Sequence, residues 1–147
     1  MPCCRRNNSL GRKIKWLNTM NKLREQIKKC MYDRASQGGK EIVKFRFPRE
    51  FAGFDGHFPG NPVLPGVCLL QAGAVILEML YGPVCLREIA EAKFYNTVLP
   101  DEEIQIECVT RSGAGNIVAA DYFVRKNGRK AAFIRLKITK PQTVKSD

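Results

Sequence analysis

The segment that most constrains this chain runs from Gly56 to Gly66 and reads GHFPGNPVLPG. It contains three prolines and three glycines within eleven residues, together with His57, the single histidine of the sequence. Proline holds φ near about −65° and glycine permits positive φ, so this mixture specifies an irregular but rigid path. Each residue that precedes a proline is also kept out of the helical region. The sequence therefore places its one histidine in a rigid loop.

The loop leads into a helix that we expect to be central and buried. Residues 67–80 read VCLLQAGAVILEML and are apolar on every side except at Gln71 and Glu78. A helix that lacks a polar face is normally buried. Pro65 suits the first helical turn, where a missing N–H group costs nothing, and Gly82-Pro83 ends the helix.

Strands are predicted on both sides of this helix. Residues 44–47, Lys-Phe-Arg-Phe, alternate as in a half-buried strand. After the helix, the stretches with strand character are residues 86–98, 103–111, 116–125 and 130–139. Asn127-Gly128 predicts a type I′ hairpin between the last two. One long buried helix followed by an antiparallel meander gives an α+β fold in which a curled sheet surrounds the helix.

The N-terminal part of the chain differs from the rest in charge. Residues 1–40 carry eleven Lys/Arg against two acidic residues, whereas residues 41–147 carry fourteen against twelve. We expect residues 1–17 to form a basic, flexible arm, residues 18–140 a single domain and residues 141–147 a C-terminal tail. A short helix with Asn18 or Thr19 as its N-cap is predicted to reach residue 33, and Ser-Gln-Gly-Gly at 36–39 breaks it.

Composition argues against several classes of protein. No run reaches the roughly 18–20 apolar residues of a membrane span, and residues 1–20 lack the apolar core of a secretory signal. The six cysteines form no CxxC pair, and one histidine cannot complete a Cys/His zinc cluster. Cys68 and Cys108 fall on apolar positions and indicate small core residues. We therefore expect a reduced, cytoplasmic protein without a bound metal.

The loop sequence resembles the signature of the (3R)-hydroxyacyl-ACP dehydratases of fatty-acid synthesis, which have the hot-dog fold. That signature is His-Phe-Pro-Gly-x-Pro-x-x-Pro-Gly-Val, and residues 57–67 match each specified position. A weaker match follows at Ala92-Lys93-Phe94 and at residues 98–101, Val-Leu-Pro-Asp, where the family has Pro-Gly-Asp and this chain lacks the glycine. The likeness covers roughly residues 41–140 and implies a hot-dog fold.

The resemblance also implies a mechanism. His57 would act as general base on the proton α to the thioester carbonyl of a 3-hydroxyacyl chain. The N–H of Gly66, at the positive end of the helix, would stabilise the charge that develops on the carbonyl oxygen. The family places a catalytic Glu or Asp fourteen residues after the histidine, but this chain has Gln71 there. An amide cannot donate a proton as a carboxyl group does, so Gln71 either hydrogen-bonds the substrate hydroxyl or has no chemical task.

The resemblance implies a substrate site and partners as well. The residues expected to bind substrate are Phe58, Pro59, Gly60, Leu64, Val67 and Phe94. The acyl chain would be carried by acyl carrier protein, whose acidic surface suits the basic arm. No metal or redox cofactor is expected. The family forms its site between two subunits, so we expect at least a homodimer, or a trimer of dimers.

Three other functions compete with dehydration. A catalytically inactive acyl-binding subunit that partners an active dehydratase is favoured by Gln71. A hot-dog thioesterase would need an acidic residue beside the motif, and none is present. A nucleic-acid-binding protein would rest on the basic arm alone, and no interleaved aromatic residues support it.

Overall fold

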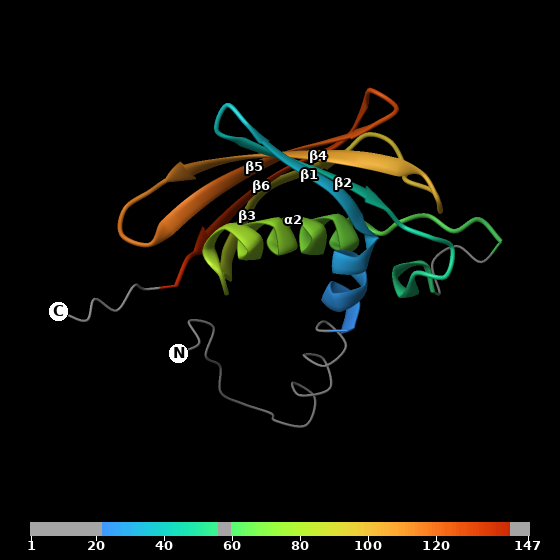
Figure 1. Ribbon diagram of the computed structural model, residues 1–147, viewed down its shortest axis with the longest axis horizontal. Helices are drawn as coiled ribbons and strands as arrows, with labels where there is room; N and C mark the ends of the chain where they lie inside the picture. The colour runs from blue at the N-terminus through green and yellow to red at the C-terminus, as the bar shows by residue number, and fades with distance from the viewer. Residues whose placement is uncertain (1–21, 56–59, 142–147) are drawn as a thin grey trace.

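The computed structural model describes residues 22–55 and 60–141 of the chain (Figure 1). Residues 22–30 are helical and lead directly into the first strand. The elements that follow, in chain order, are β1 (Met31–Gln37), β2 (Lys40–Arg46), the 3-10 turn η1 (Ala52–Phe54), the helix α2 (Gly66–Tyr81), β3 (Cys85–Phe94), β4 (Glu103–Ser112), β5 (Ile117–Lys126) and β6 (Arg129–Thr139).

All six strands belong to one antiparallel sheet, in the order β1-β2-β4-β5-β6-β3. Figure 1 shows the sheet arching over α2, which lies along its concave face. In the chain, α2 follows β2 and precedes β3. The helix therefore connects the second strand of the sheet to β3 at the opposite edge. This is the hot-dog arrangement, and it confirms the α+β prediction.

The core lies between the helix and the concave face of the sheet. Alternate residues of β4, β5 and β6 point inward and are buried, as the period of a strand requires. The helix contacts the sheet closely at Gly73, because a β-carbon there would lie 2.8 Å from Cζ of Tyr122. The Tyr122 hydroxyl donates a hydrogen bond of 2.8 Å to the carbonyl oxygen of Gly73. Glycine at position 73 therefore lets the Tyr122 ring lie against the helix backbone.

Much of this architecture was predicted correctly from the sequence. The four strands after the helix are present with ends shifted by a few residues, and the helix gains one residue at each end. Asn127 and Gly128 have φ values of 52° and 76°, as a type I′ hairpin needs. The meander is limited to β4, β5 and β6, because β3 pairs with β6 at the far edge of the sheet.

Two sequence predictions for the N-terminal part were wrong. The first helix ends at residue 30, and residues 31–33 belong to β1 rather than to the helix. The segment 36–39 was predicted to end a helix, but it joins two strands. Gly38 and Gly39 have φ values of 58° and 80° and form the turn between β1 and β2. The strand β1 was missed because it is an edge strand that is exposed along nearly its whole length. Its sequence therefore lacks the alternation of apolar and polar residues by which a strand is predicted.

The central helix is also less buried than its sequence predicts. The residues of its buried face are Cys68, Leu69, Ala72, Gly73, Val75, Ile76 and Leu77. Its other face is half-buried or exposed, and Val67 is 48% exposed. The apolar composition of this second face therefore is not explained by packing within one chain.

The cysteines follow the sequence prediction in part. Cys68 and Cys108 are buried free thiols in the core, and Cys30 is a half-buried free thiol. Burial raises the pKa of Cys30 to about 11 and that of Cys68 to about 12, so both remain protonated near neutral pH. Cys85, at the start of β3, is disulfide-bonded, which departs from the expectation of a fully reduced chain. Among the described residues, no group of side chains could hold a metal ion and no helix is long and apolar enough to cross a membrane.

Candidate active site at the start of the central helix

The loop that follows the histidine motif is anchored where it meets the helix. The N–H of Leu64 donates a hydrogen bond of 2.8 Å to the carbonyl oxygen of Val98, which ties the loop to the segment after β3. Pro65 is extended at φ −67° and ψ 148° and is the N-cap, so Gly66 is the first helical residue. The N–H groups of the first helical turn have no partner within the helix and lie at its positive end. The start of α2 can therefore receive an anionic oxygen.

The aromatic ring of Phe94 lies against Gly66. A β-carbon at Gly66 would lie 2.7 Å from Cζ of Phe94, closer than such atoms approach one another. Phe94 ends the edge strand β3, and its side chain is 53% exposed within a single chain. The structure thus places together the proposed oxyanion donor and one of the predicted substrate-binding residues. Glycine at position 66 allows the ring to lie against the first turn of the helix.

Gln71 lies one and a half turns further along α2, on the less buried face. Val67, Gln71, Ala74 and Glu78 follow one another at spacings of four, three and four residues, so they form one stripe. Gln71 and the exposed Val67 therefore share a face of the helix. A group that docks against Val67 can reach Gln71 as well.

The side chain of Gln71 is held by Arg24, from the helix at residues 22–30. Nε of Arg24 donates a hydrogen bond of 2.6 Å to Oε1 of Gln71. A second nitrogen of the same guanidinium group forms an ion pair of 2.7 Å with Oε2 of Glu78. Arg24 thus links two polar residues of α2 that lie two turns apart. Gln71 is half-buried, and its oxygen Oε1 accepts this hydrogen bond from Arg24.

The other predicted site residues have varied positions. Leu64 is buried in the core, so its side chain does not form an open wall. Gly60 has φ 89° and no atom close to where a β-carbon would lie, so glycine is present there for its backbone conformation. His57, Phe58 and Pro59 lie outside the described residues, and their roles remain predictions.

Asp101 explains the missing family glycine. It takes the position of the glycine in the Pro-Gly-Asp pattern and has φ 67°, in the left-handed region that favours glycine. Aspartate is one of the few other residues that adopt this conformation at small cost. The backbone N–H of Asp101 donates a hydrogen bond of 2.7 Å to the carbonyl oxygen of Phe47. The turn is therefore kept although its glycine is absent.

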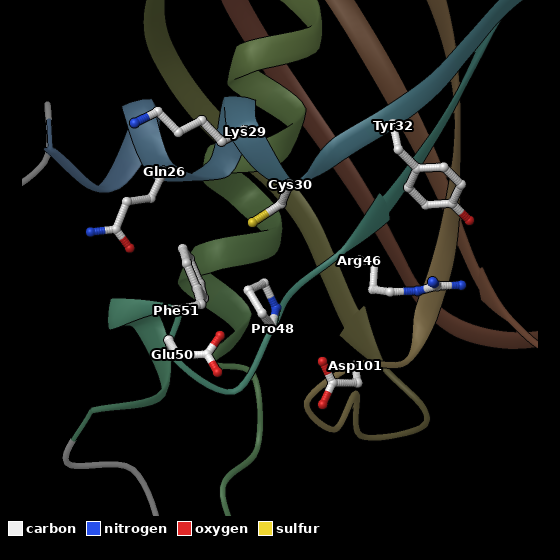
Figure 2. A pocket seen from close by; sticks show the side chains of 9 residues that line it. All are labelled: Gln26, Lys29, Cys30, Tyr32, Arg46, Pro48, Glu50, Phe51 and Asp101. Atoms are coloured by element: carbon white, nitrogen blue, oxygen red, sulfur yellow. The ribbon is translucent and has the colours of Figure 1, made fainter.

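A hollow of about 510 Å³ lies away from the predicted site residues that the structure describes. Figure 2 shows that its walls come from the N-terminal helix, the start of β1, the end of β2 and the turn at Asp101. Its lining carries both signs of charge, from Lys29 and Arg46 and from Glu50 and Asp101. One wall is Phe51, which belongs to a buried aromatic cluster. Phe51 and Phe54 are both core residues, since both side chains are buried.

The curled antiparallel sheet around α2 defines a protein of the hot-dog fold. A family model described as ApeI dehydratase matches residues 33–133, which is well over half of the chain. The chain therefore belongs to the ApeI-like dehydratase family. Arg24 lies outside the matched residues.

Curated relatives agree with this family. The 3-hydroxyacyl-[acyl-carrier-protein] dehydratase FabZ of Ligilactobacillus salivarius is 33% identical over an alignment of 107 residues that covers 67% of this chain and 76% of that protein. FabZ of Lactococcus lactis is 34% identical over 85 residues, covering 52% of this chain and 56% of the relative. Among solved structures, a chain of the dehydratase heterocomplex ApeI:P from Xenorhabdus doucetiae has a TM-score of 0.62 at 18% identity, covering 75% of this chain and 96% of that one. At that identity the likeness supports the fold alone.

Proposed function

We propose that this protein removes water from (3R)-hydroxyacyl thioesters to give trans-2-enoyl thioesters. The observation that carries the proposal is the start of α2, where the Gly66 backbone, the Phe94 ring and the motif loop converge. The N–H of Gly66 would receive the thioester oxygen as negative charge develops on it. The exposed ring of Phe94 would line the path of the acyl chain.

In the proposed reaction, His57 both takes the proton from the substrate and returns it to the leaving group. The imidazole takes the proton from C2 of the substrate, and the electrons of that C–H bond move toward the thioester carbonyl. The C3–O bond then breaks as the C2=C3 double bond forms. The imidazolium returns its proton to the departing oxygen, which leaves as water. Gln71 would hydrogen-bond the leaving oxygen without transferring a proton.

We further propose that the substrate is delivered by acyl carrier protein, in the cytoplasm. FabZ relatives are named as acting on acyl-carrier-protein substrates. The excess positive charge of residues 1–40 would attract an acidic carrier.

We propose that the protein works as a homodimer joined along β3, as a minimum assembly. Leu86, Ile89, Ala92 and Phe94 pair with the inward-facing residues of β6, and all four are exposed at the sheet edge. They continue the apolar concave face of the sheet out to its β3 edge. A second copy would cover this row together with the exposed face of α2, and would bring each Gln71 near the partner's motif loop.

We expect Ile89→Glu to convert the dimer to a monomer, because it places a charge on an apolar row that pairing would bury. The measurement is molar mass by light scattering at micromolar protein. Ile117→Glu is the matched control, since Ile117 is 42% exposed against 46% for Ile89 but lies at the start of β5, away from the β3 edge. If both variants keep the mass of the native protein, β3 is not the interface.

The activity itself is tested by incubating purified protein with 3-hydroxyacyl-ACP and following the enoyl product. Accumulation of enoyl-ACP supports dehydration. A second candidate function, an acyl-binding subunit that pairs with an active dehydratase, is favoured by the amide at position 71. That candidate predicts acyl-ACP binding without turnover. Absence of both turnover and binding would reject both functions.

A further inference from the structure

The contact between Arg24 and Gln71 fixes the direction in which the Gln71 amide points. A guanidinium group has only hydrogen-bond donors, so it can meet only the oxygen of an amide. The 2.6 Å hydrogen bond therefore assigns Oε1 to Arg24 and leaves the NH₂ group of Gln71 turned away from it. Gln71 consequently presents its two N–H donors to a ligand beside the exposed face of α2.

The guanidinium group is itself fixed by a second contact. A nitrogen of the Arg24 guanidinium group lies 2.7 Å from Oε2 of Glu78 and forms an ion pair with it. Glu78 follows Ala74 on the same stripe of α2. The next cation along this side, Arg34, faces Met79 and is paired with Glu41 of β2. Among the described residues, Arg24 is the charged residue that hydrogen-bonds Gln71, and the carboxylate of Glu78 balances the charge of Arg24.

We infer that Arg24 is a positioning residue that makes Gln71 a donor to the leaving 3-hydroxyl oxygen. This inference rests on the proposed dehydration and goes beyond it, because Arg24 lies outside the region that the family model matches. It also accounts for the amide at this position. A carboxyl group at position 71 would pair with Arg24, which would lower its pKa and keep it ionised near neutral pH. An ionised carboxylate cannot donate to the leaving oxygen, whereas an amide can.

The test uses four proteins: the native chain, Arg24→Leu, Gln71→Glu and the double variant. Arg24→Leu should lower kcat about tenfold, the usual worth of one oriented hydrogen bond, with KM nearly unchanged. Gln71→Glu alone should lower kcat or leave it unchanged at neutral pH. The double variant should be faster than Gln71→Glu, because its carboxyl group is freed from the guanidinium charge and can be protonated. Lys28→Leu is the matched control, since it removes a charge from the same helix, and Lys28 forms its ion pair with Glu25 rather than with a residue of α2.

Two readouts separate positioning from a structural role. In the pH profile of kcat, activity at high pH should be lost at a lower pH for Gln71→Glu than for the double variant. Independently of turnover, the pKa of the introduced carboxyl, followed by NMR titration, should be about one to three pH units lower when Arg24 is present. Equal pKa values in the two proteins would overturn the inference. So would an active native enzyme whose kcat and pH profile are unchanged by Arg24→Leu.

The outcomes also separate this inference from the proposed function. A native protein that neither turns over nor binds acyl-ACP rejects the dehydratase, whatever the pKa values show. A working dehydratase with no difference between Arg24→Leu and Lys28→Leu rejects only the role of Arg24. Circular dichroism and melting curves of each variant establish that it is folded before its kinetics are compared.

Discussion

His57→Ala should lower the turnover of 3-hydroxyacyl-ACP by about 10³-fold or more. The proposed mechanism uses one group both to take the α-proton and to return it, so its loss removes base and acid catalysis together, each typically worth about 10²–10⁴-fold. The fold should be retained, because the prolines and glycines of the motif set the path of the loop. The measurement is kcat/KM for enoyl product, with the melting temperature recorded alongside.

Asn61→Ala is a matched control for this prediction. Asn61 is an exposed polar residue of the same loop and has no role in the proposed proton transfers. Its substitution should change turnover severalfold at most. Equal turnover of His57→Ala and the native protein would remove His57 from the mechanism and with it the proposed reaction.

Tyr122→Ala should have the largest effect on stability. The ring is buried in the core and lies against the helix backbone at Gly73. Truncating a buried aromatic side chain costs about 3–5 kcal/mol, through lost apolar burial and the cavity that remains. For a domain of this size the melting temperature should fall by roughly 10–20 °C. Chemical denaturation monitored by circular dichroism measures the change.

Tyr122→Phe separates packing from hydrogen bonding at the same position. Burial raises the pKa of Tyr122 well above its usual value, so the hydroxyl is a neutral donor to the Gly73 carbonyl. Removing it should cost about 1 kcal/mol, since the carbonyl keeps its helical partner. A loss as large as that of Tyr122→Ala would show that the hydroxyl, rather than the ring, holds the helix on the sheet.

The sequence predicted the parts of this molecule whose signals are local. The type I′ turn at Asn127-Gly128 and the termination of α2 at Gly82 depend on residues within a few positions of each other. The motif loop at residues 56–66 predicted the family through fixed spacing. These features could be found because proline and glycine restrict the backbone in ways that do not depend on distant neighbours.

The features that the sequence did not predict depend on distant contacts. Arg24 meets Gln71 across 47 positions, and nothing near Arg24 in the chain distinguishes it from the other basic residues of that segment. The strand β1 was predicted in part as helix, because its side chains are exposed and follow no period. The exposed stripe of α2 was predicted to be buried, because apolar composition alone does not tell whether its cover comes from the same chain.

The two edges of the sheet have opposite surface chemistry, and this limits how copies can assemble. The β3 edge offers Leu86, Ile89 and Phe94 to a partner, whereas β1 presents mostly polar side chains and has an irregular register beside Met31. Charged residues and bulges at an edge strand oppose pairing with another chain. A contact in which the same edge meets itself is closed by a two-fold axis, while a contact between unlike edges would continue without end. If β3 joins two copies, the polar edge at β1 then stops growth of the sheet at a finite particle and protects the protein against forming fibres.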